Sequence, residues 1–497
     1  GGTVTETRDV VQTDTCNKCH TRLSLHGDIR REVQLCILCH NRQTSDADTG
    51  NSVDFPVMIH KIHRGADLPS VEAGEPYQIV GFGETVHDYS EVEFPQDVRN
   101  CEVCHTGANP EFHLENPNRA ACGACHDRTW FGNPTLTPAG WTNHFMEQFD
   151  DSDCTVCHTP DTTTYSVEQV HLLPTETPDA PGLALDIADV RVDATRTIVS
   201  IDFTAVDGAG APITDLAAAQ VTAGAVAAWP VPEYTTFISE VFVGLGPTSP
   251  NLVNNGGGSY TYTFTGTIPA SSDTFGVAMQ GRISFVHDEE TFRQGTATNG
   301  LTYFRTDGGE PELRRAIVDD AKCSQCHGEV RMHGTTRVGV DLCVMCHNVN
   351  TTDEAQRPPE AMPPVMVNFK DMLHRVHTGH DLTQPYTVYG RGGTPHDFTE
   401  KHFPGLRQVC DICHVEDAYE VPIDPVALPT HITQGGVLVE GGHILPERAA
   451  CTGCHDNTLA TIHALLNTDE ANEVETCAVC HGDEADFAVE AVHELGP

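Results

Sequence analysis

Cys16-Asn17-Lys18-Cys19-His20 is the first of ten C-x-x-C-H motifs in a chain of 497 residues, and these motifs contain all 20 cysteines. Two thiols one short turn apart can form thioethers with the vinyl groups of a haem, while the next residue offers an imidazole to the iron. One such motif also fits a redox dithiol or half of a zinc site. Zinc favours two separated ligand pairs, however, so ten motifs that leave no cysteine over predict ten covalently attached haem c groups. The motif residues are Cys16/Cys19/His20, Cys36/Cys39/His40, Cys101/Cys104/His105, Cys122/Cys125/His126, Cys154/Cys157/His158, Cys323/Cys326/His327, Cys343/Cys346/His347, Cys410/Cys413/His414, Cys451/Cys454/His455 and Cys477/Cys480/His481.

The composition is acidic and poor in core-forming residues. With 28 Lys+Arg against 71 Asp+Glu the net charge is −43, which would repel phosphates and excludes nucleic acid as a partner. Apolar residues make up 39% and aromatic residues 6%, so a bulky apolar cofactor is expected to fill part of the interior.

The sequence contains no apolar run of the roughly 20 residues that cross a bilayer, and its start lacks the charged and apolar regions of a signal peptide. Because haem c is attached outside the cytoplasm, we expect an exported, mature product. Since every cysteine lies in a motif, none is left to carry a lipid anchor.

The chain repeats one module twice. A shift of 307 residues superposes Cys16–Cys36 on Cys323–Cys343, and a slightly larger shift superposes Met58–His63 on Met372–His377. Because the repeat begins at Gly1, which falls on Gly308, we expect that no β domain precedes the first module in this sequence.

Three domains are predicted: pentahaem domains at 1–175 and 310–497, and an antiparallel β domain at 176–309 between them. The middle segment has no cysteine and one histidine, His287, and its polar and apolar residues alternate in runs such as Thr197–Phe203. Alternation of this kind with frequent turn residues favours a β-sandwich or small barrel. The motif-containing segments show no sustained period, so we expect mostly irregular structure and short helices wrapped on porphyrin.

Eighteen histidines lie outside the motifs and can supply the sixth ligand of each iron. Methionine is the competing ligand and would raise the potential, but the chain has only eight, and four of them lie beside better histidine candidates. We therefore predict bis-histidine ligation, with distal ligands that recur in both halves. The recurring pairs are His26/His333, His60/His374, His63/His377, His144/His463 and His171/His493.

His60 and His63 are three residues apart, so a helical turn places them on neighbouring faces, where each can serve a different haem. Which distal histidine serves which haem does not follow from the sequence. His87 and His396 also recur and are the reserve pair, with hydrogen bonding to a haem propionate as the alternative. The others lack firm counterparts or lie in the β domain, and a surface or hydrogen-bonded role is expected for them: His113, His287, His380, His402, His431 and His443.

The pattern resembles the outer-membrane decahaem c-type cytochromes of the OmcA/MtrC family. The motifs that carry the resemblance are Cys16–Gly27, Met58–His63, Phe94–Cys101 and the twin segments Ala121–Asp127 and Ala450–Asp456. The resemblance implies two pentahaem domains with split-barrel β domains, and haems arranged as a crossed wire that ends at the cell surface. The family's first β domain and lipid-anchoring cysteine have no match in this sequence.

The leading functional hypothesis is extracellular electron transfer by hopping between haems, from an outer-membrane conduit or another cytochrome to minerals, soluble metals or flavins. With two histidines on each iron, reduction at exposed haem edges would be outer-sphere, so the chain is expected to be an electron-transfer protein and not an enzyme. One alternative is a subunit of a polymeric wire, in which His402 or His443 ligates across subunits. The other is a multihaem reductase, which needs a five-coordinate iron. Calcium at Asp46–Asp48 lacks the spacing of a known loop, and a solvated acidic face is expected there.

Overall fold

The structure is a computed structural model, and it describes residues 8–160, 165–244 and 246–493. The start of the chain, including Gly1 of the repeat, lies outside the described residues. The chain forms two compact units. The first unit comprises residues 1–173, 325–328 and 404–406, and the second comprises residues 174–324, 329–403 and 407–497.

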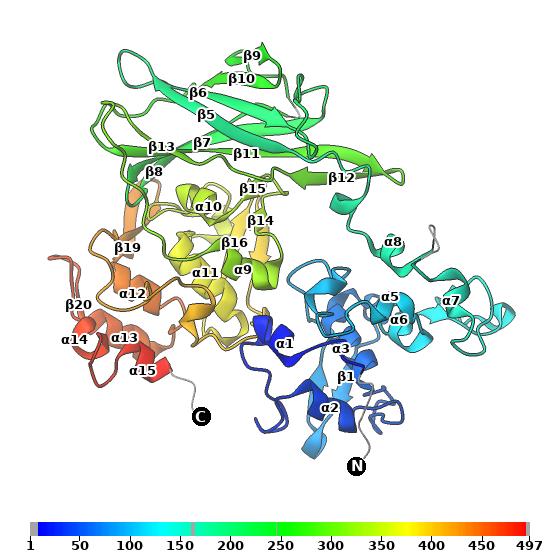
Figure 1. Ribbon diagram of the computed structural model, residues 1–497. Helices are drawn as coiled ribbons and strands as arrows, with labels where there is room; N and C mark the ends of the chain where they lie inside the picture. The colour runs from blue at the N-terminus through cyan, green and yellow to red at the C-terminus, as the bar shows by residue number, and fades with distance from the viewer. Residues whose placement is uncertain (1–7, 161–164, 245, 494–497) are drawn as a thin grey trace. The chain divides into compact units, whose positions relative to one another are not determined.

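The first unit is built from short helices joined by long irregular segments, with a small antiparallel hairpin formed by β1 and β2. Its helices in Figure 1 are α1 (Thr13–His20), α2 (Val33–Cys39), α3 (Phe55–Arg64), α4 (Pro69–Glu72), α5 (Phe112–Glu115), α6 (Arg119–Cys125), α7 (Cys154–Cys157) and α8 (Val167–His171). Its strands are β1 (Gln78–Val80), β2 (Val86–Asp88), β3 (Thr129–Trp130) and β4 (Thr142–Asn143).

The β domain of the second unit consists of two sheets that enclose a hydrophobic core. One sheet has the order β5-β6-β10-β9, and the other has the order β12-β11-β7-β8 with β13 paired to β11. The strands are β5 (Ala184–Val192), β6 (Val199–Val206), β7 (Val221–Val231), β8 (Thr236–Val243), β9 (Leu252–Gly256), β10 (Ser259–Thr263), β11 (Thr274–His287), β12 (Glu290–Gly295) and β13 (Thr302–Arg305). Inward-facing residues such as Ile201 and Phe203 are fully buried between the sheets, which confirms the predicted sandwich.

The rest of the second unit has short helices and hairpins (Figure 1). Its helices are α9 (Asp320–His327), α10 (Val340–Cys346), α11 (Phe369–Thr378), α12 (Pro446–Cys451), α13 (Thr458–Leu466), α14 (Ala478–His481) and α15 (Val489–His493). Its strands are β14 (Arg331–Met332), β15 (Arg337–Val338), β16 (Thr387–Gly390), β17 (Thr394–Asp397), β18 (Thr430–Gln434), β19 (Val437–Ile444), β20 (Thr468–Asp469) and β21 (Val474–Glu475).

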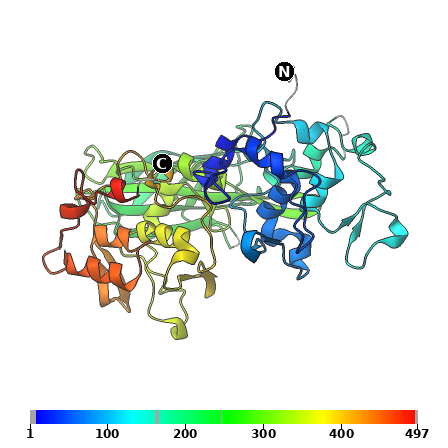
Figure 2. The same cartoon turned by 90° about the horizontal axis from the view of Figure 1, so that it is seen from below.

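Helix α10 packs on the outer face of the second sheet, and in Figure 2 the helices of this unit lie in front of its green strands. Leu342 and Met345 of α10 are buried against Val226 and Ala228 of β7. Because β7 is covered on both faces, it is almost continuously buried, as a strand with two apolar faces must be. The β domain and most of the second module therefore form one unit, and the predicted boundaries at 175/176 and 309/310 stay predictions.

Helices α3 and α11 occupy corresponding positions of the two modules and end in the same way. Each stops at a glycine with positive φ, Gly65 at 40° and Gly379 at 46°. A Cβ on Gly65 would lie 2.2 Å from the carbonyl oxygen of Val92, and one on Gly379 would lie 2.1 Å from that of Lys401. Only glycine combines this conformation with so close an approach, so both helices end at a defined residue.

The predicted fold class is confirmed, with one addition. Short helices and irregular segments dominate the motif-containing modules, but the hairpins β1–β2, β16–β17 and β18–β19 were not foreseen from the sequence. No helix in the described ranges is both long enough and apolar enough to span a membrane.

Candidate functional site

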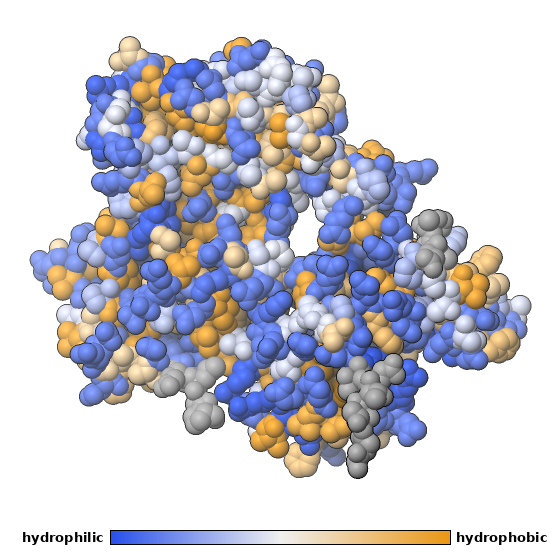
Figure 3. Space-filling model, in the orientation of Figure 1, coloured by the Kyte–Doolittle hydropathy of each residue, from blue (hydrophilic) through white to orange (hydrophobic). Residues whose placement is uncertain are grey.

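The motif cysteines lie in pairs on short helical turns, and none of them is in a disulfide. The residue before the second cysteine is apolar and exposed in three motifs, with exposed fractions of 71% for Leu38, 69% for Val156 and 77% for Val479. Figure 3 shows apolar side chains (orange) at many places on the surface. Free thiols beside uncovered apolar side chains fit the attachment of a bulky apolar group.

The exposure of the predicted attachment thiols varies along the chain. One of them, Cys346, is buried beneath the β domain. Five are exposed: Cys39, Cys122, Cys157, Cys451 and Cys480. The others are partly exposed: Cys16, Cys19, Cys36, Cys101, Cys104, Cys125, Cys154, Cys323, Cys326, Cys343, Cys410, Cys413, Cys454 and Cys477.

The sixth motif is divided between the two units of the structure. The first unit includes residues 325–328, so Cys326 and His327 belong to the first unit, whereas Cys323 belongs to the second. Inside the first unit, the Cys326 thiol donates to the carbonyl of Lys18 at 3.7 Å, and the Cys19 thiol donates to the carbonyl of Gln325 at 3.6 Å. These contacts join the first motif to part of the sixth across more than 300 positions of sequence, a pairing that no local pattern specifies.

Cys480 and His158 are predicted haem-binding residues at two of the shortest helical turns, and Cys480 is exposed whereas His158 is half-buried. Cys480 lies in the four-residue helix α14, and its thiol is exposed. His158 directly follows α7, another four-residue helix, and its Nδ1 is 2.8 Å from the carbonyl oxygen of Tyr165.

In the first unit each motif histidine of residues 1–173 faces one of the expected distal histidines. The ring centres are 6.0 Å apart for His20/His63, 5.9 Å for His26/His40, 6.2 Å for His60/His105, 6.1 Å for His126/His171 and 6.2 Å for His144/His158. His60 and His63 of α3 therefore face motif histidines from two different motifs.

In the second unit four pairs have the same arrangement. The ring centres are 6.0 Å apart for His333/His347, 6.1 Å for His374/His414, 6.0 Å for His455/His493 and 6.1 Å for His463/His481. The two remaining candidates, His327 and His377, fall in different units, and their roles as proximal and distal ligands stay predictions.

The separations match the geometry of one metal ion between two imidazoles. A metal–imidazole bond is about 2.0 Å long and the ring centre lies about 1.15 Å behind the nitrogen, so ligands on opposite sides of a metal place their ring centres about 6.3 Å apart. Two imidazole rings in ordinary van der Waals contact would not be expected to keep the same distance between ring centres from pair to pair. The residues therefore fit bis-histidine haem, and the described distances leave room for an iron between each pair.

Hydrogen bonds on the other ring nitrogen orient several of these histidines, whereas the buried Nδ1 atoms of His60, His374 and His414 have no such partner among the described residues. Nδ1 of His40 lies 2.9 Å from the carbonyl oxygen of Val53, and Nδ1 of His63 lies 2.9 Å from that of Ile59. Since a carbonyl can only accept, Nδ1 carries the proton and the lone pair is on Nε2. Such second contacts fix the tautomer and the ring orientation of metal-binding histidines.

Burial keeps several of these imidazoles neutral. It lowers the pKa of His60, His105, His333 and His374 to about 4, with neighbouring charged groups as smaller causes. At neutral pH their lone pairs are available to a metal.

The remaining histidines have other neighbours. His87 and His396 lie on β2 and β17, opposite Ile79 and Val388. His113 contacts the motif residue His105, with 3.0 Å between the two Nδ1 atoms. His287 lies 2.8 Å from Asp179, as its place in the β domain allows. The other four form two close pairs with each other: His380/His402 and His431/His443.

In the acidic segment considered for calcium, the Asp46 carboxylate is used for hydrogen bonds within the protein. The Asp46 carboxylate accepts hydrogen bonds from the Thr49 hydroxyl at 2.5 Å, the Val80 amide at 2.9 Å and the Asp48 amide at 3.0 Å. Asp46 is buried, so the solvated face expected from the sequence applies to Asp48 and not to Asp46. Within the described ranges no three His, Cys, Asp or Glu side chains are gathered for a metal ion.

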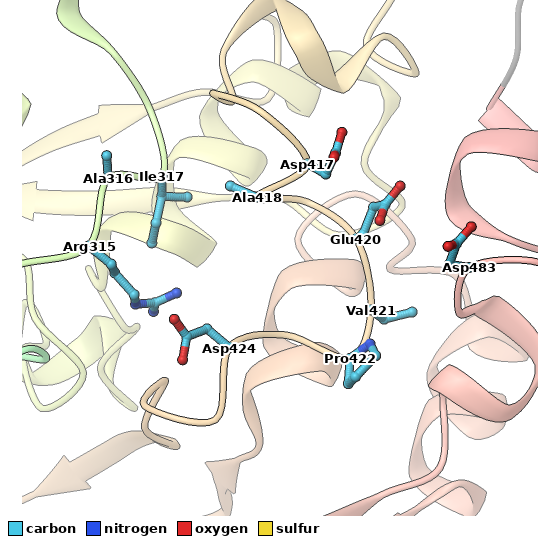
Figure 4. A pocket seen from close by; sticks show the side chains of 10 residues that line it. All are labelled: Arg315, Ala316, Ile317, Asp417, Ala418, Glu420, Val421, Pro422, Asp424 and Asp483. Atoms are coloured by element: carbon cyan, nitrogen blue, oxygen red, sulfur yellow. The ribbon is translucent and has the colours of Figure 1, made fainter.

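A pocket of about 340 Å³ lies in the second unit (Figure 4). Carboxylates surround it, and the guanidinium of Arg315 points toward Asp424 in this view. Its lining contains no cysteine or histidine, so it is separate from the residues that would hold haem. The lining residues are Arg315, Ala316, Ile317, Asp417, Ala418, Glu420, Val421, Pro422, Asp424 and Asp483.

Comparison with known proteins identifies the family. The profile described as "Outer membrane cytochrome MtrC/MtrF-like, domains II/IV" matches residues 8–172 and 315–494. The multiheme cytochrome MtrC of Shewanella baltica is 22% identical over 531 aligned residues, covering 97% of this chain and 70% of that protein.

Two solved structures share the fold. The outer membrane decaheme cytochrome OmcA superposes with a TM-score of 0.67 at 21% identity, covering all of this chain and 76% of that one. MtrC from Shewanella baltica superposes with a TM-score of 0.61 at 18% identity, covering 97% of this chain and 76% of the other. Because the family profile matches both modules, the chain belongs to the MtrC/MtrF-like outer membrane cytochromes.

Proposed function

We propose that this chain binds ten haem c groups and carries electrons at the outer-membrane surface to extracellular acceptors. The observation that supports this most directly is the set of nine facing histidine pairs, each with ring centres 5.9–6.2 Å apart. Bound haem supplies reversible one-electron chemistry, and ten groups on 497 residues bring neighbours close enough for hopping.

The chain's own residues hold and orient this array. We assign the thioether bonds to the 20 motif cysteines and the proximal ligands to the ten motif histidines. The proposed distal ligands are His26, His60, His63, His144, His171, His333, His374, His377, His463 and His493. Two imidazoles on each iron leave no vacant position, so the proposed reduction of minerals, soluble metals or flavins is outer-sphere.

The proposed donor is another cytochrome or an outer-membrane conduit. A structural relative supports this setting, since OmcA is an outer membrane decaheme cytochrome. The acidic surface, with a net charge of −43, suits a protein that must stay dispersed while it meets its partners.

Two measurements test the proposal on the intact holoprotein. A pyridine haemochrome assay combined with the mass of the protein gives the number of attached haems, and we expect ten. In stopped-flow experiments, chelated ferric iron should then oxidise all ten haems of the fully reduced protein. Fewer than ten haems, or a protein that stays reduced, would contradict the proposal.

A further inference from the structure

His431 and His443 form a pair that the haem array does not use. They face each other across the hairpin β18–β19, where they are register partners, and their ring centres are 5.0 Å apart. Neither belongs to a motif or to the recurring distal set. The pair therefore needs an explanation of its own.

The hairpin is specific to the second module. Cys104 and Cys122 are 18 positions apart in the first module, whereas the corresponding Cys413 and Cys451 are 38 positions apart. The additional residues include β18 and β19. Because the first module carries its motifs on corresponding short helices and lacks this hairpin, holding haem does not by itself require it.

The hairpin is fixed to its surroundings on the His431 side. The amide of His431 donates to the carbonyl of Val349 at 2.8 Å, and the Asn368 amide donates to the buried Thr430 hydroxyl at 2.7 Å. These contacts hold the His431 backbone in one place, so the position of its ring relative to His443 is built into the fold.

The spacing of the two rings differs from that of the facing pairs. Ligands at 90–110° on one metal ion place their ring centres about 4.5–5.1 Å apart, compared with about 6.3 Å for ligands on opposite sides. The observed 5.0 Å lies in the first range. Two adjacent positions of a four- or six-coordinate ion have this geometry.

A hydrogen bond on the other ring nitrogen of His431 leaves its Nε2 available to bind a metal ion. Its Nδ1 lies 2.9 Å from Oδ1 of Asn350, which accepts the Nδ1 proton and leaves the lone pair on Nε2. A carbonyl partner on the far nitrogen is the usual companion of a metal-binding histidine.

A carboxylate lies beside the pair. Oε1 of Glu473 is 3.8 Å from Nε2 of His443, and the Glu473 side chain is 66% exposed and so is free to change rotamer. The two histidines are thus already positioned, and a rotation of Glu473 would bring a third ligand to the same ion. The site is open to solvent, which would complete the coordination with water.

We propose that His431, His443 and Glu473 bind one divalent transition-metal ion of the kind that prefers imidazole, such as Zn²⁺, Cu²⁺, Ni²⁺ or Co²⁺. His380 and His402 have rings 4.4 Å apart and are the competing pair. Their adjacent carboxylate, Asp381, is engaged by Arg407 at 2.6 Å, so it is less available as a ligand.

The test uses Zn²⁺, which is redox-inert, and the oxidised full-length holoprotein. Equilibrium dialysis with metal analysis should find one Zn²⁺ site per chain that binds more tightly than the background. The affinity of that site should fall at least tenfold in His431→Gln and in His443→Gln. Zinc K-edge absorption should show imidazole scattering from two histidines.

His396→Gln is the matched control, because this exposed histidine lies on β17 of another hairpin in the same unit. It should leave the Zn²⁺ site unchanged, as should His380→Gln, and all variants should keep the wild-type haem content and redox titration. Only weak, non-saturating binding, or a tight site that is lost in His380→Gln and kept in His431→Gln, would overturn the proposal.

Discussion

Replacing Lys322 with glutamine is expected to lower the reduction potential of the haem bound at Cys410–His414. Nζ of Lys322 donates hydrogen bonds to the carbonyls of Asp411 at 2.6 Å and His414 at 2.5 Å. A fixed cation next to the proximal histidine opposes the extra positive charge of ferric iron. It therefore favours the reduced state, and removing it favours the oxidised state.

The size of the effect follows from the contact with His414. A charge in hydrogen-bond contact with that carbonyl lies about 8 Å from an iron bound to the same residue, and an effective dielectric constant of about 20 gives about 2 kcal/mol. For one electron this is about 90 mV. Because Lys322 is partly exposed, solvent should reduce the shift to about half, roughly 45 mV.

Spectroelectrochemical titration of the holoprotein measures the shift as a difference between variant and wild type. Lys322→Arg keeps the charge and should titrate like the wild type. Thr15 occupies the position of Lys322 in the first module, so Thr15→Lys should raise one potential there. The electrostatic reasoning fails if Lys322→Gln and wild type titrate identically, or if the charge-preserving variant shifts as far as the neutral one.

Three further predictions concern ligation, stability and pH. His63→Ala should leave one iron without its distal ligand, which electron paramagnetic resonance of the oxidised protein would detect as a new high-spin signal. Phe203 is fully buried in the β-sandwich, so Phe203→Ala should destabilise the domain by about 3–5 kcal/mol, whereas exposed Thr204→Ala should have little effect in chemical denaturation. Hydrogen bonds from a threonine hydroxyl and backbone amides hold the pKa of Asp46 at about 2, below its value of 3.8 in unfolded chains. The stabilisation is therefore present above about pH 4 and lost as the pH falls through 2; Asp46→Asn should lack this step in acid unfolding curves.

The sequence predicts the candidate ligands but not their partners. The repeat selects His60 and His63 because both recur in the second module, and their spacing places them on neighbouring helix faces. That His60 faces His105 while His63 faces His20 depends on how distant segments fold together, which no local pattern specifies. The placement of Cys326 in the first unit has the same origin. The ring spacings agree with the selected set, and ligation itself stays a prediction.

The β domain is predictable because its alternating residues face one core, while other features depend on context. The apolar run in α10 is typical of many buried segments, and nothing in it indicates packing on β7. The sequence predicts no shared site for His431 and His443 because neither has a firm counterpart in the first module, and it offers His443 only as a ligand across subunits. Comparison of the two modules identifies ligands that recur, and it cannot identify a site whose residues are present in only one module.

Helix α3 links the two haem sites that we propose for its histidines, His60 and His63. It is ten residues long, and one turn of it carries the rings that face His20 and His105. Fraying of this turn would remove a distal ligand from both proposed sites at once, so these two haems should lose their low-spin absorbance together on heating or in denaturant. A movement of the helix that changes the reduction potential of one of these haems would also change that of the other. The two potentials are therefore coupled through a single backbone segment.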